Sequence, residues 1–154
     1  RPYYFVDGPN NFSVWITPDS IEEDNSLAFC AGSHKSNNLY VPVNFKDKSS
    51  LHSDENLKKL DDEEFRKISS NGILIYNMRP GDAIFFHNKT LHRSLPSSKN
   101  KKRRALSLRM LGDNSVLTNI CAKNPQPPFE KFGMKITEGA PPDKKWFPEL
   151  PLKK

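Results

Sequence analysis

The sequence of 154 residues has few cysteines and no long apolar run. A membrane-spanning helix requires roughly 20 consecutive apolar residues, and because no stretch approaches this length we expect no membrane partner. Two cysteines, Cys30 and Cys121, could pair. Their number is more typical of reduced thiols than of a disulfide framework, and the sequence therefore favours a cytoplasmic protein.

Acidic residues are also fewer than basic ones, so that the formal net charge is +6. Five of the basic residues lie between Lys99 and Arg104. Clustered cations can bind phosphates, but no interleaved aromatic residues and no recognition helix accompany this cluster. We expect a solvated loop here and no nucleic-acid partner, and keep a basic nucleic-acid-associated module as the minor alternative.

The most informative stretch runs from Gly81 to Leu111. Two runs with strand character, Ala83 to Phe86 and Ala105 to Leu111, flank a polar and basic connection. The sequence predicts a strand, a loop that carries His92, and a second strand that opens on Arg103, with both residues presented from neighbouring strands of one sheet. The turn at 79–82 predicts a hairpin between strands at 73–78 and 83–87.

Alternation along the second strand separates its side chains into two sets. Arg103, Ser107 and Arg109 share one face with Ala105, whereas Arg104 points to the other. A neutral imidazole is a good ligand for Fe(II), Zn or Cu, and an arginine can hold a carboxylate with two parallel hydrogen bonds. If the first face lines a polar pocket, Arg103 is its anion-binding residue and Arg104 is not.

These residues resemble the motifs of a known family. Arg103 follows His92 by eleven positions, Ser94 follows it by two, and Gly81-Asp82 precedes the apolar strand. Gly32-Ser33-His34 and the strand Phe12 to Thr17 resemble two further family motifs. The combination, over most of residues 1 to 111, is similar to the phytanoyl-CoA dioxygenase family of Fe(II)- and 2-oxoglutarate-dependent oxygenases.

The resemblance implies an all-β fold with a minor helix, namely a double-stranded β-helix (jelly-roll, cupin-like). We expect an oxygenase-like core at 1–124, with a helical insertion around 51–68 that is either an active-site lid or a plain surface helix. Ser53 or Asp61 could cap that helix. A proline-rich, extended tail is expected at 125–154.

The resemblance also assigns the site. His92 would ligate iron, Arg103 and Ser94 would bind the far carboxylate of 2-oxoglutarate, and the indole of Trp15 would lie near this co-substrate. His87 is the rival metal ligand, but only His92 keeps the family's spacings. His34 is expected to have a structural or pocket-edge role.

The implied activity is hydroxylation of a C–H bond in a small-molecule substrate, with oxidative decarboxylation of 2-oxoglutarate to succinate. A facial triad needs two further ligands, which the family supplies from a His-x-Asp motif just before a segment like Arg1 to Tyr4. No fitting motif lies in the sequence. Together with the low apolar content of 35%, this leads us to expect a natural protein that extends beyond Arg1, with a fold incomplete at its N-terminus here.

Three alternatives stay open at this point. A related halogenase would lack the carboxylate ligand, a jelly-roll binding domain would lack the complete triad, and the nucleic-acid module has been described above. The sequence is compatible with a monomer or a homodimer.

Overall fold

The computed structural model describes residues 4–43, 57–95, 103–119 and 128–150. These residues form mainly antiparallel strands with one short α-helix, which confirms the predicted all-β, jelly-roll type of fold with a minor helix. The chain divides into two compact units. One comprises Arg1–Asn10, Leu39–Lys58 and Gly112–Lys154, and the other comprises Asn11–Asn38 and Lys59–Leu111.

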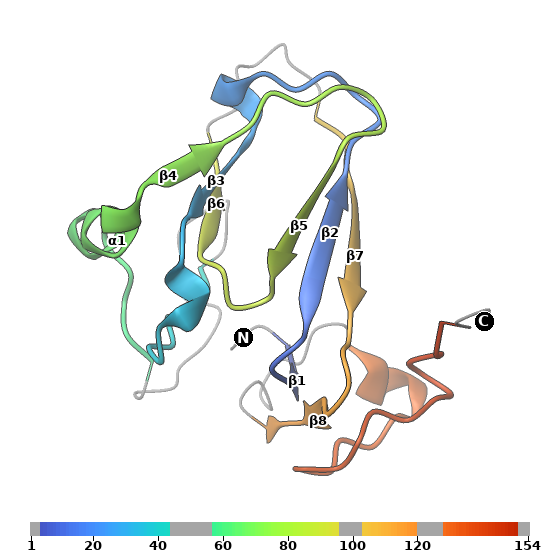
Figure 1. The fold of residues 1–154 in the computed structure, drawn as a ribbon. Coiled ribbons are helices and arrows are strands. Elements are labelled where there is room, and N and C mark those ends of the chain that lie inside the picture. Colours follow the sequence, from blue (N-terminus) through green and yellow to red (C-terminus); the bar gives the residue numbers. More distant parts are fainter. Residues whose placement is uncertain (1–3, 44–56, 96–102, 120–127, 151–154) are drawn as a thin grey trace. The chain divides into compact units, whose positions relative to one another are not determined.

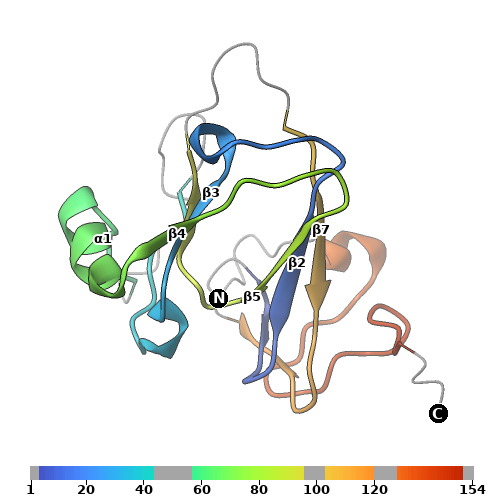
Figure 2. The same cartoon turned by 45° about the horizontal axis from the view of Figure 1, so that its top comes forward.

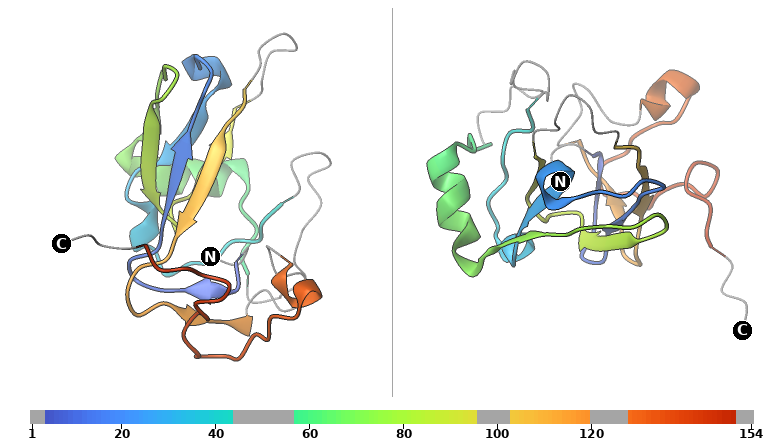
Figure 3. Two further views of the ribbon diagram at one scale, coloured as in Figure 1. Left: turned by 90° about the vertical axis from the view of Figure 1, so that its right-hand side faces the viewer. Right: turned by 90° about the horizontal axis from the view of Figure 1, so that it is seen from above.

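The second unit contains a three-stranded sheet that we call the long sheet. Its order is β5 (Ala83–His87), β2 (Phe12–Ile16) and β7 (Leu106–Met110), and each outer strand pairs with β2 over five residues. Figure 3 shows the three strands side by side. The three central residues of β2 are all buried, as expected for the middle strand of a sheet.

The same unit contains a second three-stranded sheet, the short sheet. Its order is β4 (Ile73–Ile75), β3 (Leu27–Cys30) and β6 (His92–Ser94), and the pairings cover three residues each. All four residues of β3 are buried. Figure 1 shows β3 between its two partners.

Side chains from both sheets form one core. Trp15, Leu27 and Phe29 pack with Ile21 and Met78, and Ile84 and Phe86 of β5 lie against this cluster. Ile21 and Met78 also exchange two backbone hydrogen bonds of 2.8 Å. The inner faces of the two sheets therefore face each other across an aromatic and aliphatic layer.

Helix α1 (Asp62–Ile68) lies beside β4 (Figure 2). Asp61 caps it, because its carboxylate accepts a 2.8 Å hydrogen bond from the Glu64 N–H. Three acidic residues in the first turn and two basic ones in the last complement the helix dipole. The helix lies within the expected insertion at 51–68, of which residues 51–56 are outside the described part.

Two expectations about strand pairing were wrong. β4 pairs with β3 and β5 pairs with β2, so they form no hairpin. His92 begins a strand of the short sheet, whereas the strand after Arg103 belongs to the long sheet, so the two are not on neighbouring strands. In both cases the chain passes from one sheet to the other, a choice that local turn signals do not encode.

The first unit contains a two-residue ladder between β1 (Val6–Asp7) and β8 (Val116–Leu117). Phe5 contacts Phe129 and Phe147 edge to face, with ring centroids 6.1 and 6.3 Å apart. Residues 128–150 of the expected tail contain no strand, and they make these aromatic contacts through Phe129 and Phe147. The boundary of the tail stays a prediction.

Short 3-10 turns complete the structure, at Glu23–Asn25, Ser33–Lys35, Ser69–Asn71 and Phe129–Phe132. Within the ranges given above, no helix has the length and apolar character needed to cross a membrane.

Candidate active site

His92 opens β6 and projects from the inner face of the short sheet. It lies opposite Phe29 in the β3 ladder. Its ring stacks on that of Phe29 at 5.7 Å between centroids and meets that of Phe86 edge to face at 4.9 Å. The side chain still exposes part of its surface to solvent, so one edge of the imidazole can reach a ligand.

A hydrogen bond fixes the tautomer of this imidazole. Nδ1 lies 2.9 Å from the backbone oxygen of Thr90. Because a carbonyl can only accept, Nδ1 carries the proton and Nε2 of the neutral ring keeps its lone pair. Metal-binding histidines usually donate the N–H of their other ring nitrogen to such an acceptor, which fixes the tautomer and the orientation of the ring.

The environment also favours the neutral form. The pKa of His92 is lowered, first because the surrounding rings desolvate the imidazolium and second because Arg109 is positively charged, although the Thr90 carbonyl acts in the opposite direction. A neutral imidazole is the form that binds a metal.

Ser33 fixes the chain just before His92. Its hydroxyl accepts a 2.9 Å hydrogen bond from the Leu91 N–H and donates one of 2.8 Å to the Cys30 carbonyl. Gly32 adopts φ of +75°, which turns the chain so that Ser33 can reach β6. The Gly-Ser-His motif therefore positions the segment that carries His92.

The other face of β6 contacts α1. The Arg93 guanidinium lies 4.5 Å from the centre of the Phe65 ring and 3.6 Å from the Asp62 carboxylate. Both charged groups are largely exposed, so the ion pair contributes little. Cys30 is a buried free thiol, and burial raises its pKa.

Arg103 reaches the end of β6 from the other sheet. Its Nη1 donates to the carbonyl oxygens of Asn25 and Ser26, at 2.9 and 3.3 Å. The Ser26 oxygen also accepts the Leu95 N–H at 3.1 Å. The predicted co-substrate residues Arg103 and Ser94 are thus brought to the same end of β6, because Ser94 immediately precedes Leu95.

The Arg103 site has donors to spare. The described contacts use Nη1, and a guanidinium has five N–H donors in all. The buried Ser26 hydroxyl also has no hydrogen-bond partner among the described residues. A buried polar atom beside a guanidinium is what a site for a carboxylate would offer.

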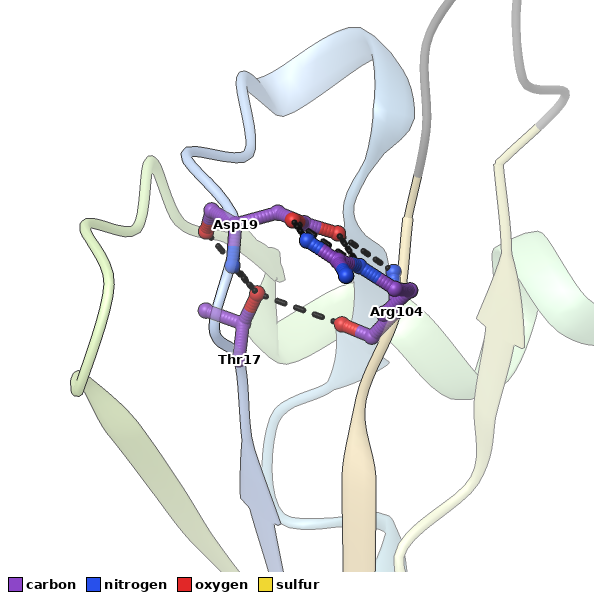
Figure 4. Close-up of polar contacts among 3 residues, drawn as sticks. All are labelled: Thr17, Asp19 and Arg104. Carbon is purple, nitrogen blue, oxygen red and sulfur yellow. Dashed lines mark hydrogen bonds and ion pairs between the residues drawn. The ribbon is translucent and has the colours of Figure 1, made fainter.

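Arg104 has a different role (Figure 4). Its guanidinium forms a hydrogen-bonded ion pair with Asp19, with an Nη2 to Oδ1 distance of 2.6 Å, and its backbone N–H donates to Asp19 Oδ2 at 2.8 Å. This pairing raises the pKa of Arg104. Thr17 completes the cluster, since its hydroxyl donates to the Asp19 carbonyl at 2.8 Å. The pair aligns β7 on β2.

The remaining candidate residues lie in or near this unit's core. Trp15 is buried between the sheets. The His87 ring packs on that of His34 with 5.4 Å between centroids, and its Nδ1 accepts the Lys89 N–H at 3.1 Å, so His87 helps to shape the turn after β5. These positions leave the predicted roles of Trp15, Ser94, Arg103 and His92 as predictions.

Three residues of the site received no role from the sequence, although one of them, Ser33, lies in the Gly-Ser-His motif. Asp19 could have been suspected from its turn after a strand, and Ser33 from its position behind a glycine. Arg109 was placed on the Arg103 face by alternation, but nothing in the sequence linked it to His92.

A metal site needs more ligands than this region provides. Among the residues that the structure describes, no group of three or more His, Cys, Asp and Glu could hold a metal ion. His92, with Nε2 directed away from its carbonyl partner, fits the role of a single ligand.

The two facing antiparallel sheets define a protein of the all-β, jelly-roll type. Residues 1–105 match the family model of phytanoyl-CoA dioxygenase (PhyH), and the chain belongs to this family. The family is generally dependent on Fe(II) and 2-oxoglutarate, so membership indicates a dioxygenase-type enzyme. A search of curated proteins found no match.

Proposed function

We propose that the protein is an Fe(II)- and 2-oxoglutarate-dependent dioxygenase that hydroxylates a C–H bond of a small molecule. The observation that carries the proposal is the His92 imidazole, whose tautomer and lowered pKa both keep Nε2 available to a metal. Family membership supports the same chemistry.

Each residue has a distinct task in this proposal. His92 supplies one iron ligand, and a His-x-Asp motif of the kind the family uses would supply the other two. Arg103 and Ser94 hold the far carboxylate of 2-oxoglutarate, and the carbonyls of Asn25 and Ser26 orient the guanidinium that does so. Trp15 borders this co-substrate from the core.

The cofactors supply the oxidation itself: Fe(II), with oxygen and 2-oxoglutarate, provides hydroxylation of a C–H bond coupled to release of succinate and carbon dioxide. The chain supplies orientation and the exclusion of water. The rings of Phe29 and Phe86 shield the His92 imidazole.

The test compares matched pairs of variants in the full-length protein. His92→Asn should abolish Fe(II)-dependent succinate formation, whereas His87→Asn should retain it, because His87 packs on His34 and shapes a turn. Thermal unfolding of both variants controls for folding. Equal activity in the two histidine variants would contradict the role of His92 as an iron ligand.

A second pair tests the co-substrate site. Arg103→Ala should raise the Kd for 2-oxoglutarate by about 30-fold or more. Removing the hydrogen-bonded charge partner of a bound anion weakens the binding free energy by at least about 2 kcal/mol. Arg104→Ala should not raise the Kd, because Arg104 is paired with Asp19. Binding measured by calorimetry with Fe(II) replaced by a redox-inert metal separates this effect from turnover.

The alternatives are outcomes of the same experiments. Substrate chlorination in the presence of chloride would indicate a halogenase. A full-length protein that binds neither metal nor 2-oxoglutarate would be a jelly-roll binding domain.

A further inference from the structure

Strand β6 carries His92 and is held by a ladder of only three residues on β3. One further backbone hydrogen bond closes the ladder beyond each end. The Cys30 N–H donates to the Leu91 carbonyl at 2.9 Å before the strand, and the Leu95 N–H donates to the Ser26 carbonyl at 3.1 Å after it. Because so short a ladder contributes few hydrogen bonds, these closing contacts decide how well each end of the strand is ordered.

At the first end the closure is complete within the protein. The Ser33 hydroxyl accepts from the Leu91 N–H at 2.9 Å and donates to the Cys30 carbonyl at 2.8 Å. A hydroxyl has a single proton to donate, and that proton is used here. This end of β6 is therefore held without any ligand.

At the second end the closing group is a charged side chain. The Ser26 carbonyl accepts from Arg103 Nη1 at 3.3 Å as well as from the Leu95 N–H, and the same Nη1 donates to the Asn25 carbonyl at 2.9 Å. The two bonds to the Ser26 carbonyl lie at the long end of the range for N–H···O hydrogen bonds. The second end is thus closed weakly, by a residue whose other nitrogens can bind an anion.

A ligand at Arg103 would tighten this closure. A guanidinium is a rigid plane, so its donors move together. A carboxylate that takes two of the remaining donors in parallel hydrogen bonds fixes the plane, and with it the direction of Nη1. Since the arginine has then already lost its rotamer freedom, the bond from Nη1 to the Ser26 carbonyl forms at a lower entropic cost.

The second end adjoins both residues that the proposed function uses on β6. Ser94 and His92 share the inner face of the strand, because their ladder partners Leu27 and Phe29 both belong to the core between the sheets. Leu95, whose N–H makes the closing bond, directly follows Ser94. A tighter second end therefore holds the backbone that carries both side chains.

We propose that Arg103 couples co-substrate binding to the order of β6, because a carboxylate bound at its guanidinium locks the Leu95 end of the strand that carries His92. The strand is firmly held at both ends only while the anion is bound. The inference rests on the proposed function, since it takes the far carboxylate of 2-oxoglutarate as this anion. It adds a conformational role to a residue that otherwise only binds.

The experiment measures amide hydrogen exchange by NMR in the full-length protein, with a redox-inert metal in place of iron. The probes are 2-oxoglutarate and 2-oxobutanoate, which has the same 2-oxo acid group for the metal but lacks the far carboxylate. Both are used at saturation, as determined by calorimetry. The Leu95 amide reports the second end of β6 and the Leu91 amide the first. The Leu117 amide, bonded to the Ala140 carbonyl at 2.8 Å in the other unit, is the control.

Exchange at Leu95 should slow by about fivefold or more with 2-oxoglutarate, the lower limit of typical coupling between two sites. It should slow less at Leu91 and not at all at Leu117, and 2-oxobutanoate should leave Leu95 unchanged. Arg103→Lys keeps the charge without the planar fork, so at saturating 2-oxoglutarate it should lose most of the slowing. Arg79→Lys, at an exposed position, is the matched control and should retain it.

The inference is overturned if 2-oxoglutarate binds and leaves exchange at Leu95 unchanged. It is also overturned if 2-oxobutanoate, or 2-oxoglutarate with Arg103→Lys, slows that exchange as much as 2-oxoglutarate does in the wild type. The proposed function fails on a different measurement, the calorimetry, if 2-oxoglutarate does not bind or binds Arg103→Ala as tightly as the wild type. Binding that depends on Arg103 without a change at Leu95 would refute only the coupling.

Discussion

The long and short sheets of the second unit differ in how their strands are held. The long sheet pairs over five residues on each side of β2, and the Thr17, Asp19 and Arg104 cluster closes one end of its β2 and β7 ladder. The short sheet pairs over three residues. Its β6 therefore depends on added contacts with Ser33 and with Phe65 of α1.

The difference shows how the two sheets share the work of the site. Backbone pairing places Arg109 within the long sheet, whereas Arg103 and Arg104 precede β7 and are held by hydrogen bonds to residues 19, 25 and 26. The histidine lies on a strand too short to be fixed by its ladder alone, and side chains of distant segments complete its support. The short sheet is thus the part of the site that is easier to disturb.

The largest expected effect comes from the core that joins the two sheets. Phe29 is 4% exposed and its ring lies 5.0 Å from that of Phe86. Phe29→Ala should lower the free energy of unfolding by about 3–5 kcal/mol. Phe85→Ala, at a side chain that is 68% exposed, should change it by no more than about 0.5 kcal/mol. Urea unfolding measures both, and similar losses would contradict the assigned core.

The next largest effect is expected from the loss of the Thr17 hydroxyl. Thr17 is fully buried, and its hydroxyl donates to the backbone carbonyl of Asp19 and accepts from the Asp19 N–H. Thr17→Val should destabilise the protein by about 1–3 kcal/mol, because the isosteric side chain leaves these groups without their partner. Thr137→Val, at an exposed position, is the control. An unaffected Thr17→Val variant would show that pairing of β2 and β7 needs no such closure.

A more local effect is expected at Ser33. Ser33→Ala leaves the Leu91 N–H without its acceptor, so amide exchange at Leu91 should accelerate by about tenfold or more. Exchange in β2 should stay as it is, since the long sheet is held separately. Ser70→Ala, at an exposed serine, should have neither effect. Equal acceleration in both sheets would mean that they open as one unit.

The smallest effect concerns pH. Because the folded-state pKa of His92 is lowered, its unfolded form binds a proton at higher pH than the folded form. Its contribution to stability is therefore complete above the unfolded pKa of about 6.5 and is lost as the pH falls through the folded value. Urea unfolding from pH 8 to pH 5 should show a shallower decline in His92→Gln than in His87→Gln. The same slope in both would contradict the lowered pKa.

Much of this arrangement was predictable from the sequence. Alternation correctly separated Arg103 from Arg104, which contact different segments. Asp61, which caps the helix, was one of the two caps that the sequence offered, and the motifs indicated the family. The pairing of β4 and β5 was predicted wrongly, because a turn between two strands is equally compatible with a hairpin and with a passage between sheets.

The sequence by itself determined where strands form, which side chains share a face, and which family motifs are present, because these depend on neighbouring residues. Only the tertiary structure decided that the strand of His92 and the strand after Arg103 pair in different sheets, and that Ser33 holds the segment before His92. These relations join residues far apart in the chain, and they depend on strand pairing and core packing, which no local pattern specifies.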